Sequence, residues 1–211
     1  MTQSAEGDPD KARLMLNLLT SVGRDGSQSQ RSLAAELGIA LGLVNAYLKR
    51  CVRKGLVKVS NAPAKRFAYY LTPEGFAEKS RLTKEYLTFS FSYFRRARMG
   101  CDRVFEIIAS RGGTRVVLAG ISDLAEIAII CSIERRLLIV AVVDPNTEIA
   151  SFLELPVVRS FKDVEGCFDA VIVTDLNSQL VTYNAAVESY GKDFVFVPDL
   201  LMAPSQQAVS A

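Results

Sequence analysis

The sequence predicts two domains of different fold class: a mainly α-helical N-terminal domain with one β-hairpin, and a C-terminal α/β domain built on a parallel sheet. Three observations support this expectation. The chain has 211 residues, which is long for one compact domain and sufficient for two. The hydrophobic pattern changes from helical spacing to continuous apolar runs near residue 112, and the sign of the charge changes near the middle of the chain.

The charge asymmetry is the more informative of these features. Residues 1–100 contain 17 Lys and Arg against 8 Asp and Glu, a net charge of +9. Residues 101–211 contain 8 against 15, a net charge of −7. Such a split indicates that the N-terminal half binds a polyanion and that the C-terminal half does not.

The N-terminal half has the pattern of helices followed by a hairpin. Apolar spacing predicts a helix over 10–21, a short helix over 33–37 that a polar turn at 29–32 can cap, and a helix over 41–54. Gly38 and Gly55 end the second and third helices. Two strand-like runs then flank a turn, and they cover residues 56–60 and 66–71. Helix, tight turn, helix and hairpin together form a winged helix-turn-helix.

A long helix is predicted next, because Thr72 can cap its start and Pro73 suits its first position. Its pattern continues to about Met99, where Gly100 is expected to interrupt it before a short helix over 101–110. An apolar and aromatic stripe runs along it, made by Phe76, Leu82, Tyr86, Phe89, Tyr93 and Phe94. This stripe can pack against a second copy of the chain or within the core of one subunit, and the sequence leaves both alternatives open.

Continuous apolar runs characterise the C-terminal half, with helical segments between them. The runs cover residues 114–119, 137–143, 170–174 and 194–197. This pattern is typical of a parallel sheet covered on both faces. We therefore divide the chain into a winged-helix domain (1–75), connecting and dimerisation helices (76–111), a Rossmann-like α/β domain (112–202) and a tail (203–211).

The composition makes several functions unlikely candidates. The chain has no His, so nucleophilic arrangements that need it are excluded, and its four Cys are widely spaced without a CxxC pair. With no catalytic set in view we predict a non-enzymatic protein, no metal site and buried thiols. The longest apolar stretch, 137–143, is far short of the roughly 20 residues of a membrane span. The polar N-terminus does not read as a secretion signal, so we expect a cytoplasmic protein.

Double-stranded DNA is the expected polyanion. Residues 30–66 contain eight basic residues and one acid, and neutralising phosphates supplies much of the affinity for DNA. The helix over 41–54 is the expected recognition helix. The predicted DNA contacts are Gly42, Asn45, Ala46, Lys49 and Arg50 on that helix, Gln30, Arg31 and Ser32 towards phosphates, and Lys65 and Arg66 in the minor groove. Asn45 can pair with adenine through two hydrogen bonds.

Arg53 and Lys54 stay open, because cations near the end of a helix also stabilise its dipole.

These residues also carry a family resemblance. Over roughly residues 11–90 the chain resembles the winged-helix domain of MarR-type regulators, most closely those associated with bacterial exopolysaccharide gene clusters. The matching motifs are Gln30-Arg31, Leu37-Gly38-Ile39, Leu41-Gly42, Val44-Asn45, Lys54-Gly55-Leu56-Val57-Lys58 and Leu71-Thr72-Pro73-Glu74-Gly75. The resemblance implies DNA binding as a homodimer. Ala40 departs from it, since this turn more commonly has a Ser cap, and losing a cap costs about 1 kcal/mol.

In the C-terminal half, the run 116–119 leads into Gly120 and a helix, as in the phosphate-binding turn of a Rossmann unit. The glycine pattern is degraded, because Ser122 and Ala125 occupy the second and third glycine positions. About 20 residues further on, Asp144 ends the next strand, where an acid can bind ribose. Later strands end at Thr174-Asp175 and Pro198-Asp199, so we expect these groups to gather at one edge of the sheet.

Residues 113–200 resemble, weakly, the small Rossmann-like domains of polysaccharide biosynthesis enzymes, including the nucleotide-sugar-binding domains of sugar acyltransferases. The resemblance implies a nucleotide or nucleotide-sugar effector, with Gly120, Ser122, Asp123 and Asp144 carried over as ligand-binding residues. Against a phosphate ligand, these turns contain no Lys or Arg. The alternative is that Gly120 only permits a tight turn and that Asp144 only closes a strand.

The sequence thus predicts a dimeric, ligand-responsive transcription regulator that controls polysaccharide genes. The alternative is a DNA-tethering adaptor whose acidic C-terminal half docks a protein partner. An enzyme fused to a winged helix is the least favoured hypothesis.

Overall fold

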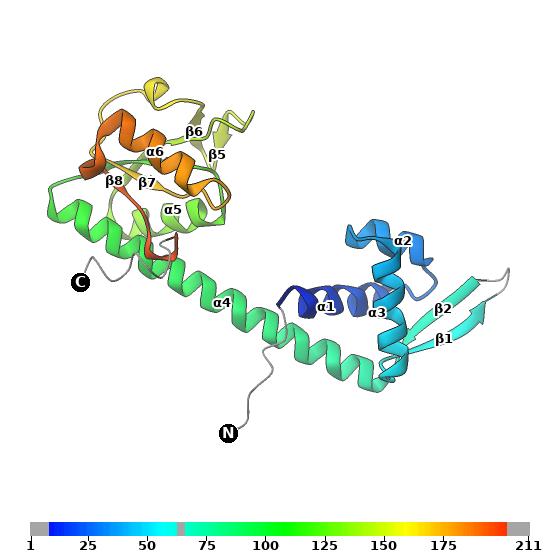
Figure 1. Ribbon diagram of the computed structural model, residues 1–211. Coiled ribbons are helices and arrows are strands. Elements are labelled where there is room, and N and C mark those ends of the chain that lie inside the picture. Colours follow the sequence, from blue (N-terminus) through cyan, green and yellow to red (C-terminus); the bar gives the residue numbers. More distant parts are fainter. Residues whose placement is uncertain (1–8, 63–65, 202–211) are drawn as a thin grey trace. The chain divides into compact units, whose positions relative to one another are not determined.

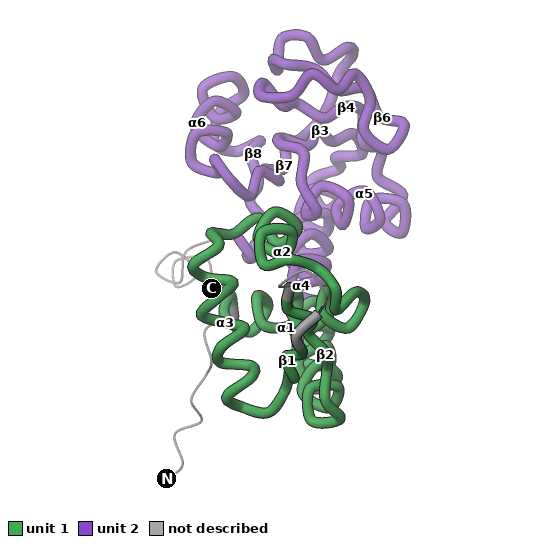
Figure 2. The backbone as a smooth tube through the Cα atoms, turned by 90° about the vertical axis from the view of Figure 1, so that its right-hand side faces the viewer, with its two compact units in different colours: residues 1–90 green, residues 91–211 purple. Residues whose placement is uncertain are grey.

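The computed structural model describes residues 9–62 and 66–201, which divide into two compact units, one up to residue 90 and one from residue 91 (Figure 2). The boundary lies inside a single long helix, α4 (Pro73–Ser110), which therefore contributes its first half to one unit and its second half to the other.

The first unit has the predicted order of helices and strands (Figure 1). They are α1 (Pro9–Arg24), α2 (Gln30–Leu37), α3 (Leu41–Arg53), β1 (Val57–Ala62) and β2 (Arg66–Leu71). Helix α2 begins earlier than the apolar pattern indicates, because the Ser29 hydroxyl accepts a hydrogen bond from the Ser32 N–H at 3.1 Å and caps the helix there.

One hydrophobic core holds this unit together. Leu18 and Leu19 of α1, Leu33 of α2, and Val44 and Leu48 of α3 are all buried in it. Thr72 then fixes the start of α4, as expected, because its Oγ1 accepts a hydrogen bond from the Gly75 N–H at 3.0 Å. The same hydroxyl donates to the Gly55 carbonyl at 2.6 Å, so the end of α3 is tied to the start of α4.

The predicted break at Gly100 is wrong, because α4 continues through it to Ser110. Glycine in a helix costs only about 1 kcal/mol, which tertiary packing can offset. Gly100 is buried, and a Cβ there would lie 3.3 Å from the Asp199 nitrogen and 3.4 Å from Pro198 Cβ. The glycine therefore permits the close approach of a later segment instead of ending the helix.

The second unit is an α/β domain with a six-stranded sheet. After the second half of α4 its elements are β3 (Arg115–Ala119), α5 (Asp123–Arg135), β4 (Leu138–Val143), β5 (Ser151–Phe152), β6 (Leu155–Val158), β7 (Ala170–Val173), α6 (Gln179–Tyr190) and β8 (Val195–Phe196), with short 3-10 turns at Phe161–Asp163, Lys192–Phe194 and Asp199–Leu201.

All four predicted runs form strands of this sheet. The sequence missed β5 and β6, because both are short and β6 contains Pro156, a residue that weakens a strand pattern.

The strand order is β5-β6-β4-β3-β7-β8, and every neighbouring pair is parallel except β5 with β6. Numbered along the chain, the parallel strands lie in the order 3-2-1-4-5, which is the order of doubly wound α/β sheets. In such sheets the strand order reverses between the first and fourth strands, here β3 and β7. Ligands of open α/β sheets gather beyond the carboxyl ends at that point.

Helices cover both faces of the sheet. Val116 and Leu118 of β3 face a core shared with α4 and α5, and Val117 and Ala119 face a second core shared with α6. All four side chains are fully buried, as the continuous apolar run predicts for a strand covered on both sides.

Three of the four thiols are buried as expected, namely Cys51, Cys101 and Cys131, whereas Cys167 is exposed. Burial raises the pKa of the Cys51 thiol to about 11, so it is protonated at neutral pH. None of the described helices combines the length and the hydropathy that crossing a bilayer requires.

Candidate nucleic-acid interface

The turn between α2 and α3 is short and well defined. Gly38 ends α2 in the left-handed conformation, with φ of 63°, and its N–H bonds back to the Ala34 and Ala35 carbonyls. Ala40 is the N-cap of α3 and makes no side-chain hydrogen bond there. Ala40, which replaces the serine more common in this turn, therefore occupies the N-cap position, where a serine hydroxyl would bond to the first turn of the helix.

Helix α3 separates a buried face from an exposed one. Val44, Leu48 and Cys51 are buried in the core of the first unit. The predicted contacts Gly42, Ala46, Lys49 and Arg50 are all exposed, and Asn45 is half-buried at the edge of the exposed face. Packing thus leaves available for DNA the face of α3 that the basic pattern predicts.

The start of α2 is anchored to the hairpin. The Gln30 side chain donates from Nε2 to the Tyr69 hydroxyl at 2.7 Å, and the Tyr69 N–H donates to the Gly26 carbonyl at 2.8 Å. Gln30 therefore positions α2 against β2 in addition to any contact with phosphate. Arg31 and Ser32, which follow it, are exposed.

The one acid among residues 30–66 is held by neighbouring polar groups. Glu36 accepts hydrogen bonds from the Ser21 hydroxyl and from the Arg24 guanidinium, each at 2.6 Å. The bonds from Ser21 and Gln28 lower the pKa of Glu36, with a smaller contribution from Arg24. Because Arg24 pairs with this carboxylate, the acid opposes the basic surface less than its charge alone suggests.

Two hollows lie between the helices and the hairpin. One has a volume of about 520 Å³ and the other of about 350 Å³, and both are lined by Gln30, Phe67 and Tyr69. The first also has Ser27, Ser29, Arg31 and Leu41 in its wall. The second also has Asn45, Leu48, Lys49, Val52, Arg53 and Val59. The structure thus brings predicted contacts of α2 and α3 to one concave surface.

The sequence did not predict that residues of the hairpin, above all Phe67, would line this surface. The alternation of the strands offered a signal, because Val59, Phe67 and Tyr69 share one face of the hairpin. It could not indicate that part of this face extends beyond the core. Arg53, which the sequence left open, lines the second hollow with Asn45 and Lys49.

Lys65, predicted for the minor groove, lies outside the described residues, and for Arg66 only the backbone is described, where it begins β2.

In the second unit, the predicted ligand residues lie at the carboxyl edge of the sheet, and hydrogen bonds join three of them, Gly120, Ser122 and Thr174. Ser122 caps α5 by accepting hydrogen bonds from the Leu124 and Ala125 N–H groups at 3.1 and 3.3 Å. Its hydroxyl donates to the Thr174 carbonyl at 2.6 Å. Thr174 in turn donates from Oγ1 to the Gly120 carbonyl at 2.6 Å. These bonds join the ends of β3 and β7 where the strand order reverses.

Asp144 and Asp175, also at this edge, accept hydrogen bonds from the turns around them. Asp144 accepts hydrogen bonds from the Ile121 N–H and the Asn146 N–H, both at 2.9 Å. Burial acts to raise the pKa of Asp175, but bonds from the Ser178 N–H, the Thr182 hydroxyl and the Asn177 N–H lower it overall. Asp123, by contrast, is exposed at the start of α5.

Gly120 is required by the backbone at this edge. Its φ is +103°, and a Cβ there would lie 2.5–2.7 Å from Asp175 atoms. Its role in a tight turn therefore accounts for the glycine without a ligand.

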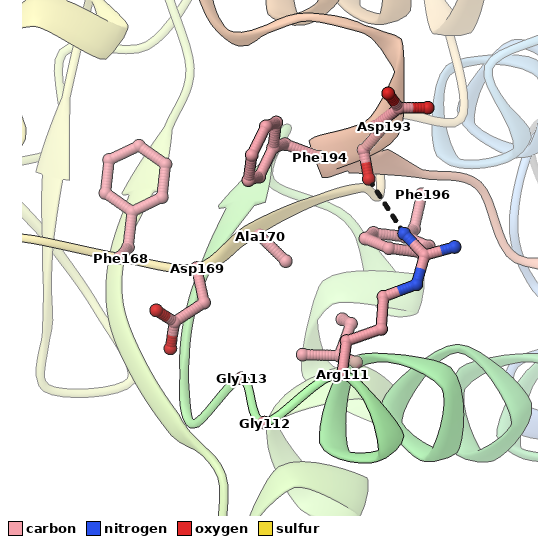
Figure 3. Close-up of a pocket in the computed structure, with 10 residues that line it drawn as sticks. Arg111, Gly112, Gly113, Phe168, Asp169, Ala170, Asp193, Phe194 and Phe196 are labelled. Carbon is pink, nitrogen blue, oxygen red and sulfur yellow. Dashed lines mark hydrogen bonds between the residues drawn. The ribbon is translucent and has the colours of Figure 1, made fainter.

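A further hollow opens at the opposite edge of the sheet, beside the C-terminal end of α4 (Figure 3). Its volume is about 260 Å³, and Phe168, Phe194 and Phe196 are in its wall. The Arg111 guanidinium lies over the Phe196 ring, 5.2 Å from its centre, and donates to the Asp193 carbonyl at 3.0 Å. The cation of this hollow is thus already bonded within the chain.

Comparison with known families identifies the first unit. Residues 12–58, from α1 into the start of β1, match the family model of winged helix-turn-helix DNA-binding domains. No curated protein matches the chain. The first unit is therefore a winged helix-turn-helix domain of the DNA-binding kind.

Solved structures resemble parts of the chain at low similarity. A MarR family protein of Mycobacterium tuberculosis, in complex with p-aminosalicylic acid, is 18% identical over 34% of this chain and 55% of its own, with a TM-score of 0.30. MepR, a transcription regulator of the Staphylococcus aureus multidrug efflux pump MepA, is 17% identical over 40% and 71%, with a TM-score of 0.35. A putative O-methyltransferase of Nostoc punctiforme is 12% identical over 90% and 59%, with a TM-score of 0.25. At these TM-scores the likenesses add no argument to the family match.

A serine at position 40 should stabilise the first unit. In Ala40→Ser the hydroxyl can accept a hydrogen bond from the first turn of α3, for a gain of about 1 kcal/mol, or roughly 4–8 °C in the melting temperature of a domain this size. Thermal unfolding followed by circular dichroism measures the change. Ala46→Ser, in the exposed interior of the same helix, is the matched control and should give a loss of a few tenths of a kcal/mol. Equal shifts for the two variants would contradict the assignment of Ala40 as the cap.

Proposed function

We propose that this protein is a MarR-type transcription regulator that binds duplex DNA as a dimer, with its second unit as the responsive part. The observation that carries the proposal is the exposed basic face of α3, in a domain that matches a DNA-binding family model. Arg31, Lys49 and Arg50 lie on the exposed side of the helix-turn-helix and supply charge for phosphates. Gly42, Asn45 and Ala46 are the groups proposed to reach base edges.

Binding to DNA should depend steeply on salt. Each phosphate contact contributes about 0.9 to the slope of log affinity against log salt concentration. Arg31→Gln and Lys49→Gln should each weaken binding and lower the slope by about 1. Fluorescence anisotropy with a labelled duplex from upstream of the gene, between roughly 50 and 200 mM salt, measures both effects.

Arg81→Gln is the matched control, because Arg81 is also exposed in the first unit but forms ion pairs with Glu78 and Glu85 of α4. Its slope should equal that of the wild type. A wild-type affinity that does not change with salt, or an absence of binding to duplex DNA, would contradict the proposal.

We place the dimer interface on α4. Leu87, Phe91 and Phe94 are spaced by four and three residues, so they share one side of the helix, and their exposed fractions are 45%, 57% and 37%. Of the stripe predicted from the sequence, Phe76, Tyr86 and Phe89 are exposed as well, whereas Leu82 is buried. Packing within one subunit therefore accounts for Leu82 and Tyr93, which contact the two cores, and leaves the rest of the stripe exposed. A contiguous apolar surface of this kind favours a second copy of the chain.

A charge on this side of α4 should separate the dimer. Phe91→Glu should weaken dimerisation by about 30-fold or more, since removing a central aromatic contact typically costs 2 kcal/mol or more. Sedimentation equilibrium measures the dissociation constant. Arg96→Glu introduces the same side chain at an exposed position on the other side of α4 and should leave the dimer intact. A monomeric wild type, or a Phe91→Glu protein that dimerises normally, would contradict the interface.

For the second unit we propose an effector-sensing role, in which a nucleotide or nucleotide sugar at the carboxyl edge changes the spacing of the two DNA-reading domains. The doubly wound strand order supports a Rossmann-like domain, and Gly120, Ser122, Asp123, Asp144, Thr174 and Asp175 gather at this edge. A change in the distance between the two DNA-reading domains would alter binding, because a dimer reads half-sites about one helical turn apart. The resemblance to exopolysaccharide-associated regulators makes polysaccharide biosynthesis genes the proposed targets.

One observation favours the alternative, an acidic docking module for a protein partner. The donors that would hold a phosphate at the start of α5, the Leu124 and Ala125 N–H groups, already bond to Ser122. Isothermal titration calorimetry of the full chain with UDP-glucose, NAD and ATP distinguishes the two roles. A sensor should give saturable heat with one of them, and Ser122→Gly should change its affinity. No heat with any of them would favour docking.

A further inference from the structure

An apolar strip on the inner face of the hairpin continues beyond the core of the first unit. The strand register pairs Val59 with Tyr69 and Asn61 with Phe67, which places Val59, Phe67 and Tyr69 on one face. Tyr69 is 4% exposed and belongs to the core, whereas Val59 is 42% exposed and Phe67 54% exposed. The strip therefore changes from core to surface within two residues of β2.

The surroundings of Phe67 are those of the DNA-facing surface. Its ring lines one hollow with Asn45 and Lys49 of α3, and the neighbouring hollow with Arg31 and Leu41. More than half of its surface is exposed, so packing inside the domain does not account for an aromatic side chain at this position. The adjacent cations point to a polyanion, and a phenylalanine there needs an apolar group on that same ligand.

Duplex DNA offers such a group in the major groove, where a recognition helix lies. The C5 methyl of thymine is the apolar feature that distinguishes this base, and aromatic or aliphatic side chains pack against it. We infer that Phe67 reads sequence by packing on a thymine methyl group, beside the base pairs that α3 contacts. The inference rests on the proposed DNA binding and adds the hairpin to the elements that select the operator.

The test uses duplexes selected by the wild-type full-length protein from a random library. In the selected duplex, thymines are replaced one at a time by uracil, which lacks only the methyl group. Losing one methyl contact corresponds to about 0.8 kcal/mol, or roughly a fourfold loss of affinity. We expect this loss at a thymine beside the bases read by α3. Phe67→Ala should weaken binding to the thymine duplex by at least as much and should be insensitive to uracil at that position.

Two further variants distinguish a loss of the methyl contact from a general disturbance of the hairpin. Phe67→Leu keeps an apolar side chain and should retain most of the sensitivity to uracil. Tyr70→Ala is the matched control, because Tyr70 lies on the opposite face of the same strand, pairs with Lys58 and is 55% exposed. Its affinity and its response to uracil should match the wild type. Because Phe67 carries no charge, the salt slope of Phe67→Ala should equal that of the wild type, unlike that of Arg31→Gln.

Each outcome decides the inference. Sensitivity to uracil that persists unchanged in Phe67→Ala would overturn it and would assign the methyl contact to another residue. A wild type that is insensitive to uracil at every thymine would also overturn it. Wild-type affinity in Phe67→Ala would overturn it too, while leaving DNA binding by α3 intact. If the wild type selects no duplex from the library, the proposed function and this inference fail together.

Discussion

Helix α3 must bury Val44, Leu48 and Cys51, and the candidate interface depends on that constraint. Once these side chains lie in the core, the rest of the helix surface has one orientation, with Lys49 and Arg50 exposed. The left-handed Gly38 allows α2 to end just before α3, so the exposed start of α2 lies on the same concave surface as α3. The hairpin completes the surface, because Tyr69 bonds to Gln30 and to the turn after α1.

In the second unit, the strand order and the hydrogen bonds at the carboxyl edge point in different directions. Its strands have the order in which a nucleotide is often bound, yet the groups at the reversal point bond to each other. Ser122 supplies the acceptor that a phosphate would supply, and Asp144 accepts from the turn that follows β3. A ligand there would have to replace these bonds or bind around them, which is why the fold alone does not identify an effector.

Helix α4 is the element that both units share, and its middle is unusual. A helix in a compact domain buries its apolar side, whereas Leu87, Phe91 and Phe94 leave theirs exposed. The cost of exposing these side chains is removed if two copies pack together along this helix. The same helix passes through Gly100, where close packing of a later segment takes the place of a break.

The sequence by itself determined the two fold classes, the element order of the first unit and the basic character of α3. Each of these follows from local spacing, capping residues and charge, which act over a few residues. The tertiary structure decided what depends on contacts between distant segments. Hydrogen bonds across the sheet use Ser122, Thr174 and Asp144 within the chain, and packing continues α4 through Gly100. The hairpin register places Phe67 beside Asn45, and no pattern within a single strand could have revealed that neighbour.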